Sequence, residues 1–122
     1  MDAKGEVEEM KPLVSVLLPV RNGEAELARA LTSLLSQDYP NIEIIVVDDC
    51  STDGTARIAE WFQRHCPDRV RLLRIKNRRL PVDMTVGSAY YPRKLAFEVA
   101  RGEYVLDFNV HVTVPPDFVS TY

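Results

Sequence analysis

Cysteine and long apolar runs are scarce in this chain of 122 residues, and positive charge is not in excess. The two cysteines, Cys50 and Cys66, form neither a disulfide framework nor a metal-binding spacing, which favours reduced thiols in a cytoplasmic protein. The formal net charge of −3 gives no global signal for nucleic-acid binding. No apolar run approaches the roughly 20 residues that a membrane-spanning helix requires.

Glycine is also scarce, with five residues, and its distribution excludes two nucleotide-binding motifs. A dinucleotide-binding turn needs G-x-G-x-x-G after the first strand, but residues 19–26 read PVRNGEAE and contain one glycine. A P-loop is missing as well. The only histidines are His65 and His111, and no Ser/His/Asp or Cys/His order stands out around them. The sequence therefore predicts neither a dehydrogenase nor a P-loop enzyme.

The overall composition is that of a globular protein, with 46% hydrophobic and 27% charged residues. The length suits one domain and is too short for two. Residues 1–12, MDAKGEVEEMKP, are charged and lack the apolar core of a secretion signal. We therefore expect a flexible leader at 1–12 and one domain at 13–122.

Apolar runs and helical spacings alternate along the domain. Strands are expected at 13–20, 42–49, 69–75 and 103–110. Helices are expected at 23–36 with Asn22 as the N-cap, after the STDGT stretch at 51–55 with Ile58, Trp61 and Phe62 on one apolar face, and at 93–100. This order predicts an α/β fold, a Rossmann-like and largely parallel sheet with helices on both faces.

The unusual stretches of the sequence all follow predicted strands. They are PVRN, DDCSTD, KNRR and NVHV, whereas the turns expected at the opposite edge are plain. Ligands of such sheets collect at the carboxyl ends of the strands. The sequence therefore predicts a binding site at that edge.

Asp48 and Asp49 end the second predicted strand. A carboxylate there can accept hydrogen bonds from a nucleobase or ribose, or it can cap the turn and helix that follow. We expect the pair to divide, one aspartate capping and one binding. Ser51 and Asp53 are expected to serve the helix start.

Cations also lie near this edge. Arg21, which precedes Asn22, can place its guanidinium on a base or against a phosphate, or it can be an exposed cation without a ligand. Lys76, Arg78 and Arg79 follow the third strand, where a diphosphate would suit them, although a solvated surface is the favoured interpretation.

The segment VSVLLPVRNGEAELARALTSLLSQDYPNIEIIVVDDCSTDGT, residues 14–55, strongly resembles the opening of family 2 glycosyltransferases of the GT-A fold. Three parts match: a strand ending in PVRN, a helix ending in SLLSQDYPNIEI, and VVDDCSTDGT. The later stretch ARGEYVLDFNVHVTVPPDF, residues 100–118, resembles the segment around the metal motif of the same family. Between them, residues 77–92 match weakly.

The resemblance implies a nucleoside-diphosphate sugar, such as a UDP-sugar, as the partner of this chain. Asp49 would hydrogen-bond the base, with Asp48 close by, and Arg93 would support the nucleotide, although Lys94 stands where the family has asparagine. The nucleotide-binding residues that we expect are Pro19, Val20, Arg21, Asn22, Asp48, Asp49 and Arg93.

The metal motif departs from the family, because residues 108–112 read FNVHV where its members usually read LDADD. Mg²⁺ or Mn²⁺ bound there normally neutralises the diphosphate, and such cations prefer carboxylate oxygen. His111 could bind a softer ion, with Asn109 as a weak neutral ligand, but Val112 cannot coordinate. Loss of the metal site is favoured over a site rebuilt on His111. Asp107 stands where the family has an apolar residue and needs a partner.

Family members continue into an acceptor-binding half that supplies the catalytic base for inverting transfer, and no such base is identified here. Two functions therefore stay open. The first is a donor-binding domain of a glycosyltransferase. The second is a truncated, degenerate or redesigned GT-A-like module that binds or scaffolds without catalysis. We predict no catalytic residue, and we expect a homo-oligomer that shields the uncovered sheet.

Overall fold

The computed structural model describes residues 11–75, 90–111 and 115–120. Its elements are β1 (Val14–Val20), α2 (Glu24–Leu35), β2 (Ile42–Asp49), α3 (Thr55–His65), β3 (Val70–Ile75), α4 (Tyr90–Val99) and β4 (Tyr104–Asp107). The predicted alternation of strands and helices is confirmed. Residues 1–10 of the expected leader and the basic residues Lys76, Arg78 and Arg79 lie outside the described residues.

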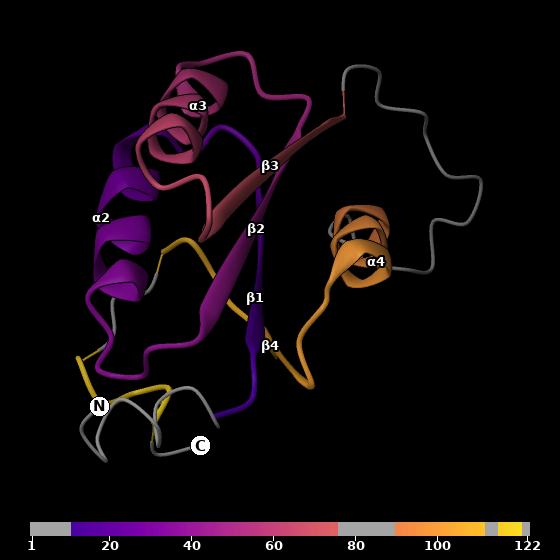
Figure 1. Ribbon diagram of the computed structural model, residues 1–122. Coiled ribbons are helices and arrows are strands. Elements are labelled where there is room, and N and C mark those ends of the chain that lie inside the picture. The colour runs from indigo at the N-terminus through magenta and orange to yellow at the C-terminus, as the bar shows by residue number, and fades with distance from the viewer. Residues whose placement is uncertain (1–10, 76–89, 112–114, 121–122) are drawn as a thin grey trace.

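The four strands are parallel and lie in the order β3-β2-β1-β4. Helices α2 and α3 cover one face of this sheet and α4 covers the other (Figure 1). The chain first moves outward from β1 to β3 and then returns to the far side of β1. Right-handed crossovers place the helices on opposite faces when the direction reverses in this way. The predicted α/β fold with helices on both faces is therefore confirmed.

Strands β1 and β2 form the buried centre of the sheet, and every residue of β2 is buried. Neighbouring residues of a strand point to opposite faces. Leu18 and Ile44 consequently pack with α2 in the larger core, whereas Leu17 and Ile45 pack in a smaller core with Ala96 of α4. Burial on both faces explains why these strands are continuous apolar runs in the sequence.

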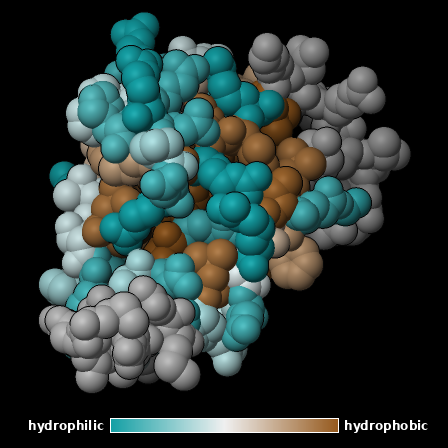
Figure 2. All heavy atoms as spheres, viewed as in Figure 1, coloured by the Kyte–Doolittle hydropathy of each residue, from teal (hydrophilic) through white to brown (hydrophobic). Residues whose placement is uncertain are grey.

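β3 is an outer strand of the sheet, and most of its residues are only half-buried. Figure 2 shows apolar atoms at the surface in the middle of this side, framed by hydrophilic atoms. Trp61 was predicted to share one face of α3 with Ile58 and Phe62, and its ring lies edge-on to that of Phe62 with centroids 5.0 Å apart. Its side chain is exposed and stacks on His65 with ring centroids 4.0 Å apart, while Ile58 and Phe62 pack against the core.

Two boundaries differ from prediction by more than one residue. Helix α4 begins at Tyr90 instead of residue 93, and Pro92 lies in its first turn, where a proline is tolerated because the N–H groups have no intrahelical partner. Strand β4 ends at Asp107 instead of residue 110. Lys11 and Pro12 of the expected leader are held through their carbonyl oxygens, which accept hydrogen bonds from Asn41 and Tyr39 respectively.

Candidate functional site

A cavity of about 470 Å³ opens at the carboxyl edge of the sheet, where β1 meets the chain that follows β4. Its described lining consists of Pro19, Val20, Arg21, Asp49, Pro92, Arg93, Phe108, Asn109, Val110 and His111. All predicted site residues except Asn22 and Asp48 are in this lining. The cavity therefore lies at the point where the strand order reverses, the usual ligand position in open α/β sheets.

The early end of β4 creates this space. Asp107 pairs with Leu17, and the N–H of Phe108 donates to the carbonyl of Leu17 at 2.9 Å, after which the chain leaves the sheet. Strand β1 continues to Val20 beside β2. Gly23 leaves room for the Val20 side chain, because a Cβ there would lie 2.5 Å from it, whereas Val110 at 3.7 Å would be in ordinary van der Waals contact.

The two aspartates at the end of β2 occupy different environments. Asp48 is buried, and its Oδ1 accepts a hydrogen bond from the N–H of Ser51 at 3.2 Å. Its Oδ2 lies 3.7 Å from Nε of Arg74. Asp49 lies in the lining of the cavity. Asp48 therefore stabilises the turn, and the ligand-binding roles of both aspartates stay predictions.

Asn22 joins the two loops that follow β1 and β2. Its N–H donates to Oγ of Ser51 at 2.9 Å, and its Oδ1 accepts from the N–H of Thr52 at 2.8 Å. Asn22 is not the N-cap of α2, because that position is Gly23 and makes no side-chain cap. The first N–H groups of α2 donate instead to Oγ1 of Thr55 and Oδ2 of Asp53, which lie about 30 residues away in sequence and could not be identified from local pattern.

Asp53 serves the starts of both helices. Its Oδ1 accepts from the N–H of Thr55 at 2.9 Å and from the Thr55 hydroxyl, and its Oδ2 accepts from the N–H of Glu24 at 3.2 Å. Hydrogen bonding from the Thr55 hydroxyl, followed by these backbone donors, holds the pKa of Asp53 below its ordinary 3.8. The prediction that Asp53 serves a helix start is confirmed, and it extends to α2.

Arg93 and Asp107 form an ion pair at the rim of the cavity, with Nε of Arg93 2.7 Å from Oδ2 of Asp107. Both side chains are about half-exposed. The sequence indicates that Asp107 needs a partner, but only the packing of α4 beside β1 brings Arg93 to it. The pair places a guanidinium at the cavity.

The donors near the metal positions do not fit a hard divalent cation. Oδ1 of Asn109 accepts a hydrogen bond from the N–H of His111 at 2.9 Å. His111 is exposed, and its Nδ1 lies 3.9 Å from Oε1 of Glu26, a neighbour that the sequence did not indicate. Across the described ranges, no three His, Cys, Asp or Glu side chains come together as metal ligands would. A metal on Asn109 and His111 stays a prediction that this donor set does not favour.

Comparison with known proteins decides the family. Residues 15–121 match the profile of glycosyl transferase family 2. The chain belongs to this family. It is 36% identical to glycosyltransferase GlyG of Streptococcus pneumoniae over 112 residues, which cover 92% of this chain and 34% of GlyG. The resemblance to the family in the sequence is thereby confirmed.

Solved structures of family relatives share the fold. The Staphylococcus aureus TarS structure in complex with UDP has a TM-score of 0.75 and 29% identity, covering 89% of this chain and 30% of that one. A mannosyltransferase from Pyrobaculum calidifontis in complex with GDP-Man and Mn²⁺ has a TM-score of 0.73 and 29% identity, covering 88% and 30%. Divalent metal thus occurs in a relative. The chain spans about a third of the length of the curated relatives that it matches first.

None of the helices within the described residues is long and apolar enough to cross a membrane.

Proposed function

We propose that this chain binds a nucleoside-diphosphate sugar, and that it is the donor-binding domain of an inverting family 2 glycosyltransferase. The observation that carries the proposal is the cavity lining shared by Arg21, Asp49 and Arg93, which come from the loop after β1, the end of β2 and α4. A relative, TarS, has been solved with UDP and with UDP-GlcNAc, which supports a uridine nucleotide as the ligand.

Each part of such a ligand has a counterpart in the lining. Pro19 and Val20 offer apolar surface to the base, and the Asp49 carboxylate accepts a hydrogen bond from the imide N–H of uracil. Arg21 and Arg93 offer planar donors to the diphosphate. Bound in this way, the donor presents its anomeric carbon at the open side of the cavity.

In transfer with inversion, the acceptor hydroxyl attacks the anomeric carbon while the nucleoside diphosphate leaves, and a general base takes the hydroxyl proton. We assign no described residue to that base, and no step is routed through a metal. A metal on Asn109 and His111, the location in the cytoplasm and the domain boundary at residue 13 stay predictions.

The second candidate is a GT-A-like module that binds or scaffolds without catalysis. Asn109 and His111 favour it, because a neutral amide and an exposed imidazole replace the acids expected there. Binding of UDP without turnover of any UDP-sugar would select this alternative.

Calorimetric titration of the full chain with UDP, GDP and ADP tests the proposal, with buffers that contain either Mn²⁺ or EDTA. We expect micromolar binding of UDP and weaker binding of the other two. Asp49→Asn should lower the affinity for UDP by about tenfold or more, since the amide offers a neutral acceptor in place of a charged one.

Asp68→Asn is the matched control, because it removes the same charge from an exposed position outside the cavity lining. Its affinity for UDP should equal that of the unmodified chain. Absence of heat with all three nucleotides in both buffers would refute the proposed function.

A further inference from the structure

We infer that arginine side chains, and not a bound divalent cation, neutralise the diphosphate in this cavity. The inference rests on the proposed function and concerns the charge that balances the ligand. A diphosphate needs positive partners in a partly desolvated site, and Arg, Lys and Mg²⁺ can all supply them. The side chains in and around the cavity decide between these partners.

The positions after β4 offer too little negative charge for a cation. Mg²⁺ is held by one or two carboxylates together with substrate phosphates, at near-octahedral geometry. Asn109 is neutral, and its Oδ1 already accepts the N–H of His111 at 2.9 Å. The nearest carboxylate on the strand, Asp107, lies 2.7 Å from the guanidinium of Arg93. A cation at this position would have to share the Asp107 carboxylate with that guanidinium.

Positive charge is present on two sides of the cavity instead. Arg21 follows β1, and Arg93 projects from α4, which covers the opposite face of the sheet from α2 (Figure 1). The guanidinium group of arginine is a permanent cation in proteins. The cavity therefore carries fixed positive charge that does not depend on recruiting an ion.

The contacts of these two residues leave donors for a ligand. Arg21 is exposed and makes no hydrogen bond or ion pair within the described ranges. Arg93 approaches Asp107 most closely through Nε, and a guanidinium has five N–H donors, more than one carboxylate can engage. A guanidinium fixed at Nε can direct its Nη atoms at phosphate oxygens as a planar fork.

Asp107 contributes to this arrangement by orienting Arg93. A long arginine side chain loses considerable rotamer entropy when a ligand orders it. A carboxylate at Nε limits that freedom before the ligand arrives, at the expense of some repulsion toward the diphosphate. Both members are about half-exposed, so solvent and salt screen the repulsion.

Calorimetry of the full chain with UDP and with uridine tests the inference, each in excess EDTA and in excess Mn²⁺. We expect the Kd for UDP to agree within about threefold between the two conditions, a difference smaller than one decade of affinity. Arg93→Ala and Arg21→Ala should each lower the affinity for UDP by about tenfold or more, because hydrogen bonds to a charged group are lost. Arg93→Ala should leave uridine binding unchanged, because uridine has no phosphate.

Arg93→Lys keeps the charge and loses the fork, so its affinity for UDP should lie between those of the unmodified chain and Arg93→Ala. Arg29→Ala is the matched control, because Arg29 is an exposed arginine of α2 outside the cavity lining. This substitution should leave the affinity for UDP unchanged. Far-ultraviolet circular dichroism and thermal melts establish that each variant is folded.

UDP binding that requires Mn²⁺ would overturn the inference and leave the proposed function standing. Unchanged UDP affinity in folded Arg21→Ala and Arg93→Ala would overturn it as well. If no nucleotide binds under any condition, the proposed function and this inference both fail.

Discussion

Two residues at the ligand edge, Asn22 and Cys50, have backbone φ angles in the left-handed region, 51° and 54°. Asparagine tolerates this region better than most residues, and the Asn22 side chain also bonds Thr52. Cysteine has no such preference. A non-glycine residue held in this region costs on the order of 1–2 kcal/mol, so the turn after Asp49 stores strain at Cys50.

Cys50→Gly should relieve this strain. We expect it to be about 1 kcal/mol more stable than Cys50→Ala, measured as the free energy of unfolding in urea. The alanine variant is the control, because both substitutions remove the thiol and its contacts while only glycine removes Cβ. Glycine loses about 0.4–1 kcal/mol more on folding than alanine at an unstrained position, so a glycine variant less stable than the alanine variant by that amount would show that the backbone is unstrained.

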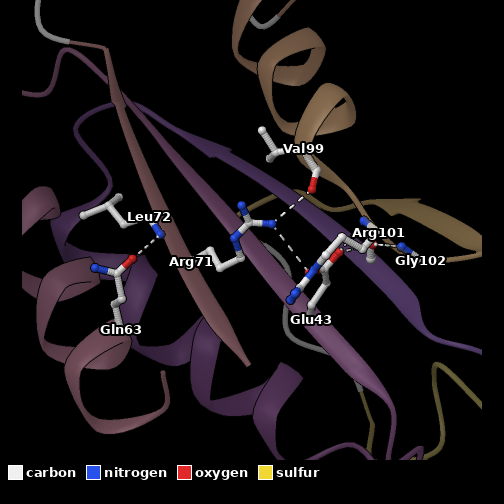
Figure 3. Close-up of polar contacts among 8 residues, drawn as sticks. Glu43, Gln63, Arg71, Leu72, Val99, Arg101 and Gly102 are labelled. Carbon is white, nitrogen blue, oxygen red and sulfur yellow. Dashed lines mark hydrogen bonds and ion pairs between the residues drawn. The ribbon is translucent and has the colours of Figure 1, made fainter. Parts of the chain in front are cut away.

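On the scale of elements, the buried Glu43 carboxylate connects β2 with β1 and with the loop between α4 and β4, at the end of the sheet opposite the cavity. Oε2 of Glu43 in β2 accepts from the Ser15 hydroxyl of β1 at 2.6 Å and from the N–H of Arg101 at 2.7 Å. The Arg101 side chain donates to Oε1 at 3.0 and 3.1 Å, and the Arg71 guanidinium lies 3.8 Å away (Figure 3).

The contacts of Glu43 with Ser15 and Arg101 position the start of β4. Ser15 Oγ also accepts the N–H of Gly102 at 2.9 Å, so Glu43 holds the connection between α4 and β4 against β1. Arg93 and Asp107 lie on those two elements. The geometry of the cavity therefore depends on a carboxylate at the far end of the sheet.

Burial by itself raises the pKa of the Glu43 carboxyl, but hydrogen bonds from Ser15 and Arg101 outweigh it and hold the pKa below the ordinary 4.5. A carboxyl whose pKa is depressed in the folded state contributes stability above its unfolded pKa. That contribution is lost as the pH falls through the folded value. Glu43 should therefore stabilise the fold fully at neutral pH and progressively less below about pH 4.5.

Glu43→Gln should lower the free energy of unfolding by about 2 kcal/mol or more at neutral pH, because charge-assisted hydrogen bonds are lost and buried donors then face an amide. The deficit should shrink in the acid range, where the native carboxyl is protonated. Urea unfolding at neutral and acidic pH measures both. Glu103→Gln, an exposed neighbour, should have little effect, and an equal deficit for Glu43→Gln at both pH values would contradict the assignment.

On the scale of the whole molecule, β4 is an outer strand of the described sheet and exposes apolar side chains. In the described part of the chain β4 pairs with β1 alone, and Tyr104 and Val105 are exposed by 60% and 37%. A second cavity of about 560 Å³ lies beside these residues and is also lined by Tyr39 and Val119. Unpaired strand edges with apolar side chains tend to associate.

We therefore expect the isolated chain to form a dimer or larger assembly through β4. Light scattering across a concentration series should show a mass above that of a 13.9 kDa monomer, increasing with concentration. Val105→Lys places a charge on the edge strand and should shift the equilibrium to monomer. A monomeric mass of the unmodified chain at high concentration would refute this prediction.

The sequence by itself determined the order of elements and the edge that carries the site. Val16 to Leu18 and Ile44 to Val47 are apolar on both strand faces, so they could only be central strands of a covered parallel sheet. Parallel strands bring their carboxyl ends to one edge, and for that reason Arg21, Asp49 and Asn109 could be assigned to one site from their order in the chain.

Only the tertiary structure decided which of these side chains face the cavity and which hold the loops. The caps of α2 come from a loop about 30 residues away, and Glu43 meets Arg101 across 58 residues. Local propensity describes neighbours within about a helical turn or along one strand, whereas such contacts depend on how whole elements pack. Asn22, Asp48 and Arg93 therefore obtained their surroundings from the fold.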